Sequence, residues 1–247
     1  MAAKTQEFSS VWTRPHRERR DQPALSREQI VGEALALLDT EGYDALSMRK
    51  LGTRLNAGAT SLYTHVASKD EILELAIDEA FGDVRTPTDI KPENWRADLL
   101  GLAQDVRAAV LRHPWISIAI TGAGLAYLGP NLLRTSDAML AVLEAAGFDD
   151  ATADRGANAI FAYVLGSVGT ETAMLTSVER SGLGEQEWFT AMMAAAEQAV
   201  QGYPHVARRY GGYRRLDSAQ SREDFFNAEL DLILDGLELQ RSRAQGR

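Results

Sequence analysis

From residue 25 onward, apolar residues recur at intervals of three and four along almost the whole chain, which is the spacing of one face of an α-helix. Alanine and leucine are abundant, and no stretch has the alternating β-branched pattern of a strand. The fold class is therefore predicted to be all-α, with a three-helix N-terminal domain that contains a helix-turn-helix and a larger helical domain after it.

Residue types that carry much of enzyme chemistry are scarce in the 247 residues. The chain has no cysteine and four histidines, His16, His65, His113 and His205. The lack of cysteine excludes disulfide scaffolds, iron–sulfur clusters and thiol nucleophiles, and it fits a reducing compartment such as the cytoplasm. No two histidines stand four residues apart, so a compact histidine metal site is not encoded either. We therefore expect no metal and no other cofactor.

The formal net charge of −9 is unevenly distributed along the chain. Residues 1–69 carry 10 basic and 8 acidic side chains, whereas residues 70–247 carry 16 basic and 27 acidic ones. Within the first part, residues 45–69 contain Arg49, Lys50, Arg54 and Lys69 and no carboxylate. A small positive region on an acidic molecule is typical of a protein that touches a polyanion with one end only.

Proline, glycine and composition divide the chain into three parts. Residues 1–24 are rich in arginine, and we interpret them as a flexible basic arm, which is either a tail without a role or an arm that follows a DNA groove. Residues 25–84 are the predicted DNA-binding domain, including a connecting helix at its end. Residues 92–243 are the predicted second domain, with the two prolines of segment 85–92 at the boundary.

One uncharged stretch has the nominal length of a membrane span. Residues 115–133 form this stretch of 19 residues, but Gly122, Gly124, Gly129 and Pro130 interrupt it. We interpret it as buried interior or cavity wall, and predict no membrane segment. The N-terminus also lacks the apolar run of a signal peptide, so the expected location is cytoplasmic.

Helix boundaries are expected where capping residues and glycines fall. Ser26 with Gln29 and Ser68 with Glu71 have the spacing of capping boxes. Further helices are expected over residues 95–112, 132–146, 150–178, 186–201 and 222–241, and mostly loop over 203–221. The uncharged run 156–170 implies burial against partners on several faces of its helix.

Two short helices joined by a tight turn are predicted inside the carboxylate-free stretch. The first starts at Ser47, and the turn 56–58 leads into a second over residues 59–66, because asparagine and glycine tolerate the left-handed conformation that ends a helix. These are the proportions of a helix-turn-helix, whose second helix enters the major groove and suits uncharged polar side chains that reach base edges. The second helix is expected to turn Leu62 and Val66 inward and to expose Ala59, Thr60, Ser61, Tyr63, Thr64 and His65.

The first of these helices opens with two cations, Arg49 and Lys50, where a helix normally prefers carboxylates. A phosphate would reverse that preference, because the backbone N–H groups and both cations would then face one anion. The alternative is that both are ordinary solvated surface cations. Lys69 lies one turn beyond the second helix, where it is expected to reach a phosphate as a point charge.

Residues 45–73 as a whole resemble the DNA-binding domain of the TetR family of transcriptional regulators. Residues 226–238 also resemble the last helix of the subgroup typified by the tetracycline repressor, and Trp95 and Gly147-Phe148 match it by position. The most specific matches are Leu62, Tyr63, His65, Val66, Lys69 and Leu73.

The resemblance implies a homodimer that presents two headpieces to successive major grooves of a palindromic operator in double-stranded DNA. It implies that Arg49 reads a base, that residues 60–65 form the recognition helix, and that Lys69 contacts the backbone. It also implies that a small-molecule effector shifts the connecting helix and so releases the DNA. The seam of the dimer would pair small residues of the long helix with Leu230, Ile233, Leu234 and Leu237.

The sequence departs from the tetracycline-repressor subgroup at the positions that would hold a magnesium–drug chelate. No histidine lies between His113 and His205, and Glu171 is offset by one from the glutamate position. A more apolar or aromatic ligand is therefore expected, although a dimer seam or a plain core would have the same composition. The candidate ligand-binding residues are Trp115, Ile118, Thr121, Tyr127, Met139, Asn158, Phe161 and Met174.

Two other classes of protein are alternatives to a DNA-binding repressor. A helical adaptor that binds only protein would explain the amphipathic helices but not Arg49 and Lys50. An enzyme would need a nucleophile with a base, or a cofactor site, and no P-loop or histidine cluster is present. We therefore predict a ligand-responsive repressor and no enzymatic activity.

Overall fold

The computed structural model describes residues 25–122, 129–213 and 219–245, and every regular element within these ranges is helical. The N-terminal part contains α1 (Arg27–Glu41), η1 (Tyr43–Ala45), α2 (Met48–Arg54), α3 (Ala59–Leu62) and α4 (Lys69–Ala80). The second part contains η2 (Pro92–Asn94), α5 (Trp95–Arg112), α6 (Trp115–Gly122), α7 (Pro130–Ala145), α8 (Asp150–Ser181), α9 (Glu185–Ala199), α10 (Pro204–Tyr213) and α11 (Ala219–Gln245). The all-α prediction is confirmed. The predicted basic arm, residues 1–24, and the ligand candidate Tyr127 lie outside the described residues.

Capping explains where the first helices begin. Ser26 Oγ accepts from the Gln29 amide at 3.1 Å and Gln29 Oε1 accepts from the Ser26 amide at 2.9 Å, so the predicted capping box is confirmed. At α4, Ser68 Oγ accepts from the Glu71 amide as predicted, at 3.1 Å. Glu71 Oε2, however, accepts from the Ala67 amide at 2.6 Å, because that N–H also precedes the helix and has no partner inside it.

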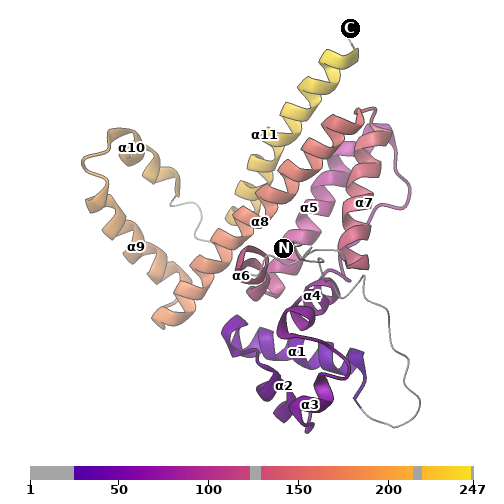
Figure 1. Cartoon of the computed structure of the whole chain (residues 1–247). Coiled ribbons are helices and arrows are strands. Elements are labelled where there is room, and N and C mark those ends of the chain that lie inside the picture. The colour runs from indigo at the N-terminus through magenta and orange to yellow at the C-terminus, as the bar shows by residue number, and fades with distance from the viewer. Residues whose placement is uncertain (1–24, 123–128, 214–218, 246–247) are drawn as a thin grey trace, which may run out of the picture.

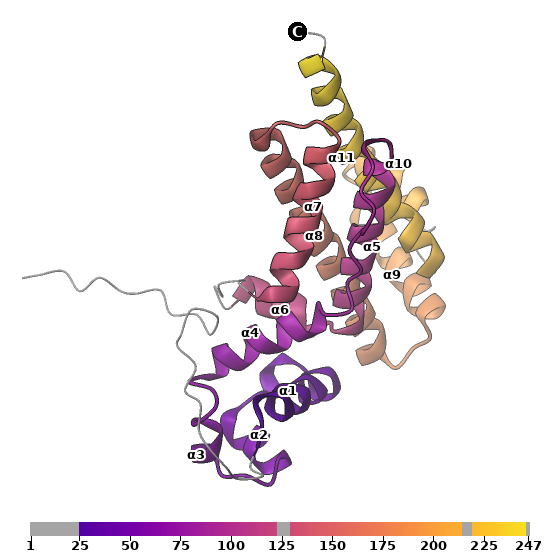
Figure 2. The ribbon, with the colours of Figure 1, turned by 90° about the vertical axis from the view of Figure 1, so that its right-hand side faces the viewer.

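The two parts are joined by α4 and share one core. In Figure 1 the N-terminal helices lie at the bottom, and α4 lies between them and the bundle above; Figure 2 shows the same order from the side. A single cluster of buried side chains runs from Ile30 in α1 through Phe81 after α4 to Leu237 in α11. The side chains of the bundle are therefore in continuous packed contact with those of the N-terminal helices.

The long helix α8 is less buried than its composition predicts. Its inner face, with Ile160, Val164 and Val168, is buried in the core. By length and composition α8 could cross a membrane, with mean hydropathy 1.2 in its most apolar 18-residue window, and 22% of that window is buried. The prediction of burial on several faces is wrong for a single chain, because α5, α7 and α11 cover only one side and leave Ala162 and Gly166 exposed.

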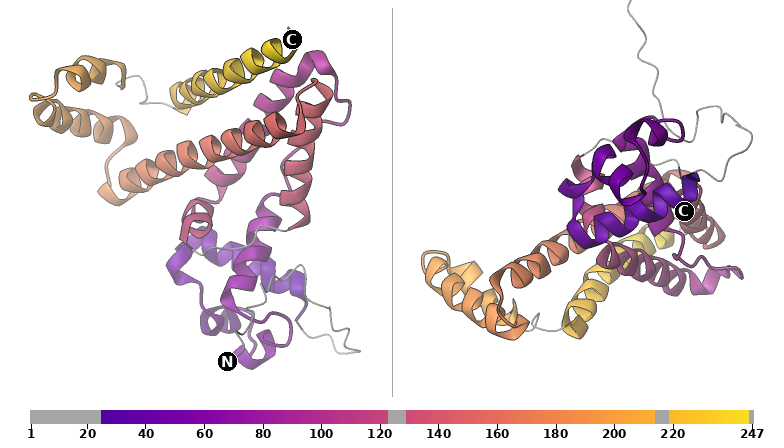
Figure 3. Two further views of the ribbon diagram at one scale, coloured as in Figure 1. Left: turned by 45° about the horizontal axis from the view of Figure 1, so that its top comes forward. Right: turned by 90° about the horizontal axis from the view of Figure 1, so that it is seen from below.

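Beyond α8 the chain turns away from the bundle. Gly182, in the left-handed conformation at φ +70°, ends α8, and α9 and α10 project from the body (Figures 1 and 3). The prediction of loop over residues 203–221 is wrong for residues 204–213, which form α10. Proline is favoured at the first position of a helix, which Pro204 occupies here.

Candidate nucleic-acid interface

The helix-turn-helix is built on a close contact between α2 and the turn that follows it. Asn56 adopts the left-handed conformation at φ +50°, and the Ala57 amide donates to Gly52 O at 2.8 Å. A Cβ at position 52 would lie 2.8 Å from Ala57 O, so the missing side chain of Gly52 lets the turn approach the helix. The asparagine turn is therefore as the residue pattern predicts.

The second helix is shorter than predicted. It ends at Leu62, and residues 63–65 continue as turns in place of a helix that reaches residue 66. Thr64 Oγ1 donates to Ser61 O at 2.7 Å, which is the competition with helix hydrogen bonds that threonine hydroxyls offer. The last predicted turn of helix is thus replaced by a tighter one.

The side chains predicted to meet DNA lie on one side of this short helix. Leu62 and Val66 are buried, as predicted, and they anchor the segment to the core. Thr60, Ser61 and Thr64 are exposed, Tyr63 is 54% exposed, and Ala59 and His65 are half-buried. The exposed groups are hydroxyls and one phenol, with no carboxylate among them. Such a surface suits the edges of bases and the oxygens of phosphates.

The cations beside this surface have unequal surroundings. Arg49 is exposed and forms no ion pair within the described part of the chain. The ammonium of Lys69 lies over the ring of Tyr43, 4.8 Å from its centroid, and makes a cation–π contact there. Lys50 is paired with Glu41 of α1.

A hollow of about 460 Å³ lies against Arg49 and Lys50. Arg54, which was not predicted to contact DNA, pairs with Glu33 and with Glu41, and its Nη1 lies 3.4 Å from Glu41 Oε1. The hydrogen bond from Lys50 lowers the pKa of Glu41 below its usual range, and the charge of Arg54 acts in the same direction. The hollow is lined by Glu41, Ser47, Arg49, Lys50, Thr53 and Arg54.

A buried carboxylate joins α4 to the start of α7. Asp78 Oδ1 accepts from the backbone amides of Asn131 and Leu132 at 2.9 and 3.1 Å, and Oδ2 accepts from Asn131 Nδ2 at 3.1 Å. Burial raises the pKa of Asp78, and the two backbone hydrogen bonds oppose that rise. Gly129 leaves room for the carboxylate, because a Cβ there would lie 2.2 Å from Asp78 Oδ1.

A second carboxylate joins α1 to the junction of α5 and α6. Asp39 Oδ1 accepts from Trp115 Nε1 at 2.7 Å and lies 2.8 Å from Nδ1 of the buried His113. Neither Asp39 nor Asp78 was predicted as functional. On an amphipathic helix an acidic residue looks like ordinary solvated surface, and no local spacing marks its distant partner.

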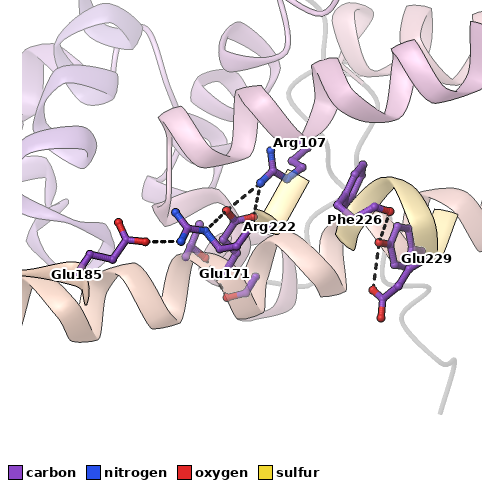
Figure 4. A network of polar contacts seen from close by, with 9 residues as sticks. Arg107, Glu171, Glu185, Arg222, Phe226 and Glu229 are labelled. Atoms are coloured by element: carbon purple, nitrogen blue, oxygen red, sulfur yellow. Dashed lines mark hydrogen bonds and ion pairs between the residues drawn. The ribbon is translucent and has the colours of Figure 1, made fainter. Parts of the chain in front are cut away.

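The second part contains a buried network of charges, shown in Figure 4. Glu171 of α8 accepts from Arg107 Nη2 at 2.8 Å and from Arg222 Nε at 3.0 Å, and Arg222 also pairs with Glu185 of α9. Nearby, Tyr163 Oη donates to Phe226 O at 2.8 Å, and burial raises the pKa of Tyr163. Glu171 is thus engaged by two guanidinium groups, and within the described residues no three acidic or histidine side chains are grouped as a metal site.

The residues predicted to bind a ligand are dispersed. Trp115 and Met139 are buried in the core, whereas Ile118 and Asn158 are exposed. Phe161 and Met174 are half-buried on α8, and Thr121 lies on α6 at the edge of the described residues. A second hollow, of about 350 Å³, lies between α8 and α11, and none of these residues is among those that line it.

Comparison with known proteins covers both parts of the chain. Residues 30–76 match the family described as "Bacterial regulatory proteins, tetR family", and residues 87–241 match the "Tetracyclin repressor-like, C-terminal domain". An HTH-type transcriptional regulator of Saccharopolyspora erythraea is 42% identical over 179 residues, which are 71% of this chain and 75% of that protein.

Two solved structures share the fold. The TetR family protein ActR of Streptomyces coelicolor, in complex with actinorhodin, has a TM-score of 0.70 at 26% identity over 87% of this chain and 96% of that chain. BioQ with its double-stranded DNA operator has a TM-score of 0.56 at 27% identity, over 64% of this chain and 93% of that chain. The chain is thus a transcriptional regulator and not an enzyme, and it belongs to the TetR family.

Proposed function

We propose that this regulator is a repressor that binds a palindromic operator in the cytoplasm as a homodimer, and leaves it when a small, largely apolar or aromatic molecule enters the second domain. The observation that carries the proposal is the exposed, carboxylate-free surface of Thr60, Ser61, Tyr63 and Thr64 beside the exposed Arg49. Similarity to BioQ, whose structure contains its double-stranded operator, supports double-stranded DNA as the partner.

The exposed faces of α8 and α11 support the homodimer. On α8, Ala159, Ala162 and Gly166 follow one another at three- and four-residue spacing and are exposed. On the adjacent α11, Leu232 is 72% exposed and Leu239 is 51% exposed. Apolar surface of this extent on two neighbouring helices favours a four-helix seam with a second copy.

The composition of that seam differs from the one expected from the sequence. Leu230, Leu234 and Leu237 are buried in the core of their own chain, so they are not free to meet a partner. Ile233 is half-buried and lines the hollow between α8 and α11. We therefore propose Leu232 and Leu239 in place of the three buried leucines.

An apolar or aromatic effector is supported by similarity to ActR, whose structure contains actinorhodin. Of the apolar candidate lining residues, we retain Ile118, Phe161 and Met174, which are not fully buried. Trp115 is engaged with Asp39 of α1, so an effector near α6 would act on the N-terminal part directly. The Asp78 contact with α7 offers a second route through α4.

Binding to duplex DNA over a range of salt concentrations tests the proposal. The wild type is expected to prefer one palindrome over random duplex, with affinity falling steeply as salt rises. Lys69→Ala should make that salt dependence shallower by about one phosphate contact, whereas Thr60→Ala or Ser61→Ala should change the preferred bases. Equal binding to all duplexes at moderate salt would contradict the proposal, and thermal shifts across a compound panel test the effector class.

A further inference from the structure

Tertiary packing changes the charge of the helix-turn-helix surface from what its sequence suggests. The stretch 45–69 has four cations and no carboxylate, but α1 brings two carboxylates against two of those cations. Glu41 pairs with both Lys50 and Arg54, and Glu33 pairs with Arg54. Part of the positive charge is therefore neutralised inside the free protein.

These ion pairs are accessible to an external anion. The side chains of Lys50 and Glu41 are 39% and 40% exposed, and those of Arg54 and Glu33 are 33% and 28% exposed. Lys50, Glu41 and Arg54 border the hollow of about 460 Å³, whose other walls are Ser47, Arg49 and Thr53. Ion pairs with this exposure are weak, because water and salt screen both charges. Ammonium and guanidinium groups bind phosphate oxygens as well as carboxylate oxygens.

We propose that this hollow is a contact site for a backbone phosphate of duplex DNA, and that the Glu41 carboxylate occupies the phosphate's place in the free protein. The proposal rests on the proposed function, since it needs a DNA-bound state. It assigns Arg54 as a phosphate contact beside Lys50, and Glu41 as an internal competitor that weakens sequence-independent attraction to DNA.

The competition has a measurable consequence in the salt dependence of binding. Each cation that meets a phosphate releases counterions from DNA, which makes affinity fall as salt rises. When DNA displaces Glu41, the freed carboxylate takes up a cation from solution and cancels part of that release. Removing the carboxylate should therefore raise the affinity at low salt and make the salt dependence steeper.

The decisive variant is Glu41→Gln, titrated with a random-sequence duplex over a range of salt concentrations. We expect its affinity at low salt to rise about two- to fivefold, the range set by weak exposed ion pairs, and its log–log slope to steepen by up to about 1. Asp44→Asn is the matched control, because it makes the same change of charge on an exposed residue that forms no ion pair within the described residues. An equal effect of the control would overturn the proposal.

A second comparison places Glu41→Gln in a protein that already carries Lys50→Gln and Arg54→Gln. The gain in affinity should vanish there, since no cation remains for the carboxylate to block, and a gain that persists would overturn the proposal. Should thermal unfolding show that Glu41→Gln is not folded, Glu33→Gln removes one of the two carboxylate partners of Arg54 and has the same expected direction. Wild type that binds no duplex would overturn the proposed function as well, whereas equal slopes for wild type and Glu41→Gln would overturn this inference alone.

Discussion

At the scale of single residues, Asp78 joins two helices outside the proposed DNA-binding surface. Asp78 lies on α4 and is 4% exposed. Its Oδ1 accepts hydrogen bonds from the backbone amides of Asn131 and Leu132 in the first turn of α7. Backbone amides at the start of a helix have no hydrogen-bond partner within the helix. The Asp78 carboxylate supplies that partner for α7 and thereby links α7 to α4. The adjacent Gly129 is needed for the approach.

Asp78→Asn should lower the free energy of unfolding by about 1–3 kcal/mol, because a buried donor would lose its acceptor. Asp78 Oδ1 accepts from two backbone amides, so the asparagine NH₂ group would replace Oδ2 and face Asn131 Nδ2, donor against donor. Urea denaturation measures the change, with Glu79→Gln on the exposed side of α4 as the control. Equal midpoints for both variants would contradict this role.

Asp105 makes a pH-dependent contribution. The hydrogen bond from Arg85 lowers the pKa of Asp105 below its ordinary value of 3.8. A lowered folded-state pKa stabilises the protein above the unfolded-state pKa, and that stabilisation is lost as pH falls through the folded-state pKa. Arg85 is 87% exposed, so Asp105→Asn should cost only about 0.2–1 kcal/mol. The free energy of unfolding should be measured for both proteins near neutral pH and at about pH 3. The difference between wild type and variant should be smaller in acid, and an equal difference at both pH values would contradict this contribution.

At the scale of elements, α8 carries much of the surface proposed for association with a second copy. One side of it supports the core of its own chain, and the opposite side has small exposed residues beside the exposed leucines of α11. A helix with two apolar sides is stable in water only when both are covered, which is the reason to expect a second copy there.

Ala162→Glu should convert the dimer into a monomer, because it places a charge in the proposed seam. Operator affinity should then fall by about 10²-fold or more, since one headpiece no longer holds the other at its half-site. Sedimentation gives the mass, and titration of the palindrome gives the affinity. Ala145→Glu, at the exposed end of α7, is the matched control. A variant that stays dimeric would place the seam elsewhere.

At the scale of the whole molecule, two carboxylates of the N-terminal part receive donors from the second part. Asp39 of α1 accepts from Trp115, and Asp78 of α4 accepts from the start of α7. These two contacts and the shared core join the N-terminal part rigidly to the second part. Such a connection is needed if an effector in the second part is to move the N-terminal part.

Trp115→Phe should lower the free energy of unfolding by about 1–3 kcal/mol, because it removes an indole N–H bonded to a carboxylate across the two parts. Trp188→Phe is the control, since α9 lies outside the shared core. Chemical denaturation followed by far-UV circular dichroism gives both values. Similar losses in the two variants would show that the bond to Asp39 contributes nothing of its own.

Much of this architecture follows from neighbouring residues in the sequence. The caps at Ser26 and Ser47 and the turn at Asn56 depend on partners within a few residues, and local spacing predicts them. The inward positions of Leu62 and Val66 follow in the same way from helical periodicity. The family resemblance of residues 45–73 belongs to this group, because its motif is contiguous.

What only the tertiary structure decided are the contacts between helices that are distant in the chain. No local pattern predicts the ion pair of Glu41 with Lys50 or the hydrogen bond from Trp115 to Asp39. Nor does one predict that Leu230 is buried in the core of its own chain. Hydrogen bonding along the backbone determines a helix from residues three and four apart, whereas the partner of a surface carboxylate depends on how whole helices pack. The sequence by itself therefore determined most helices and the helix-turn-helix motif, because these depend on residues close together in the chain. Packing decided which charged side chains beside that motif are paired and which are free.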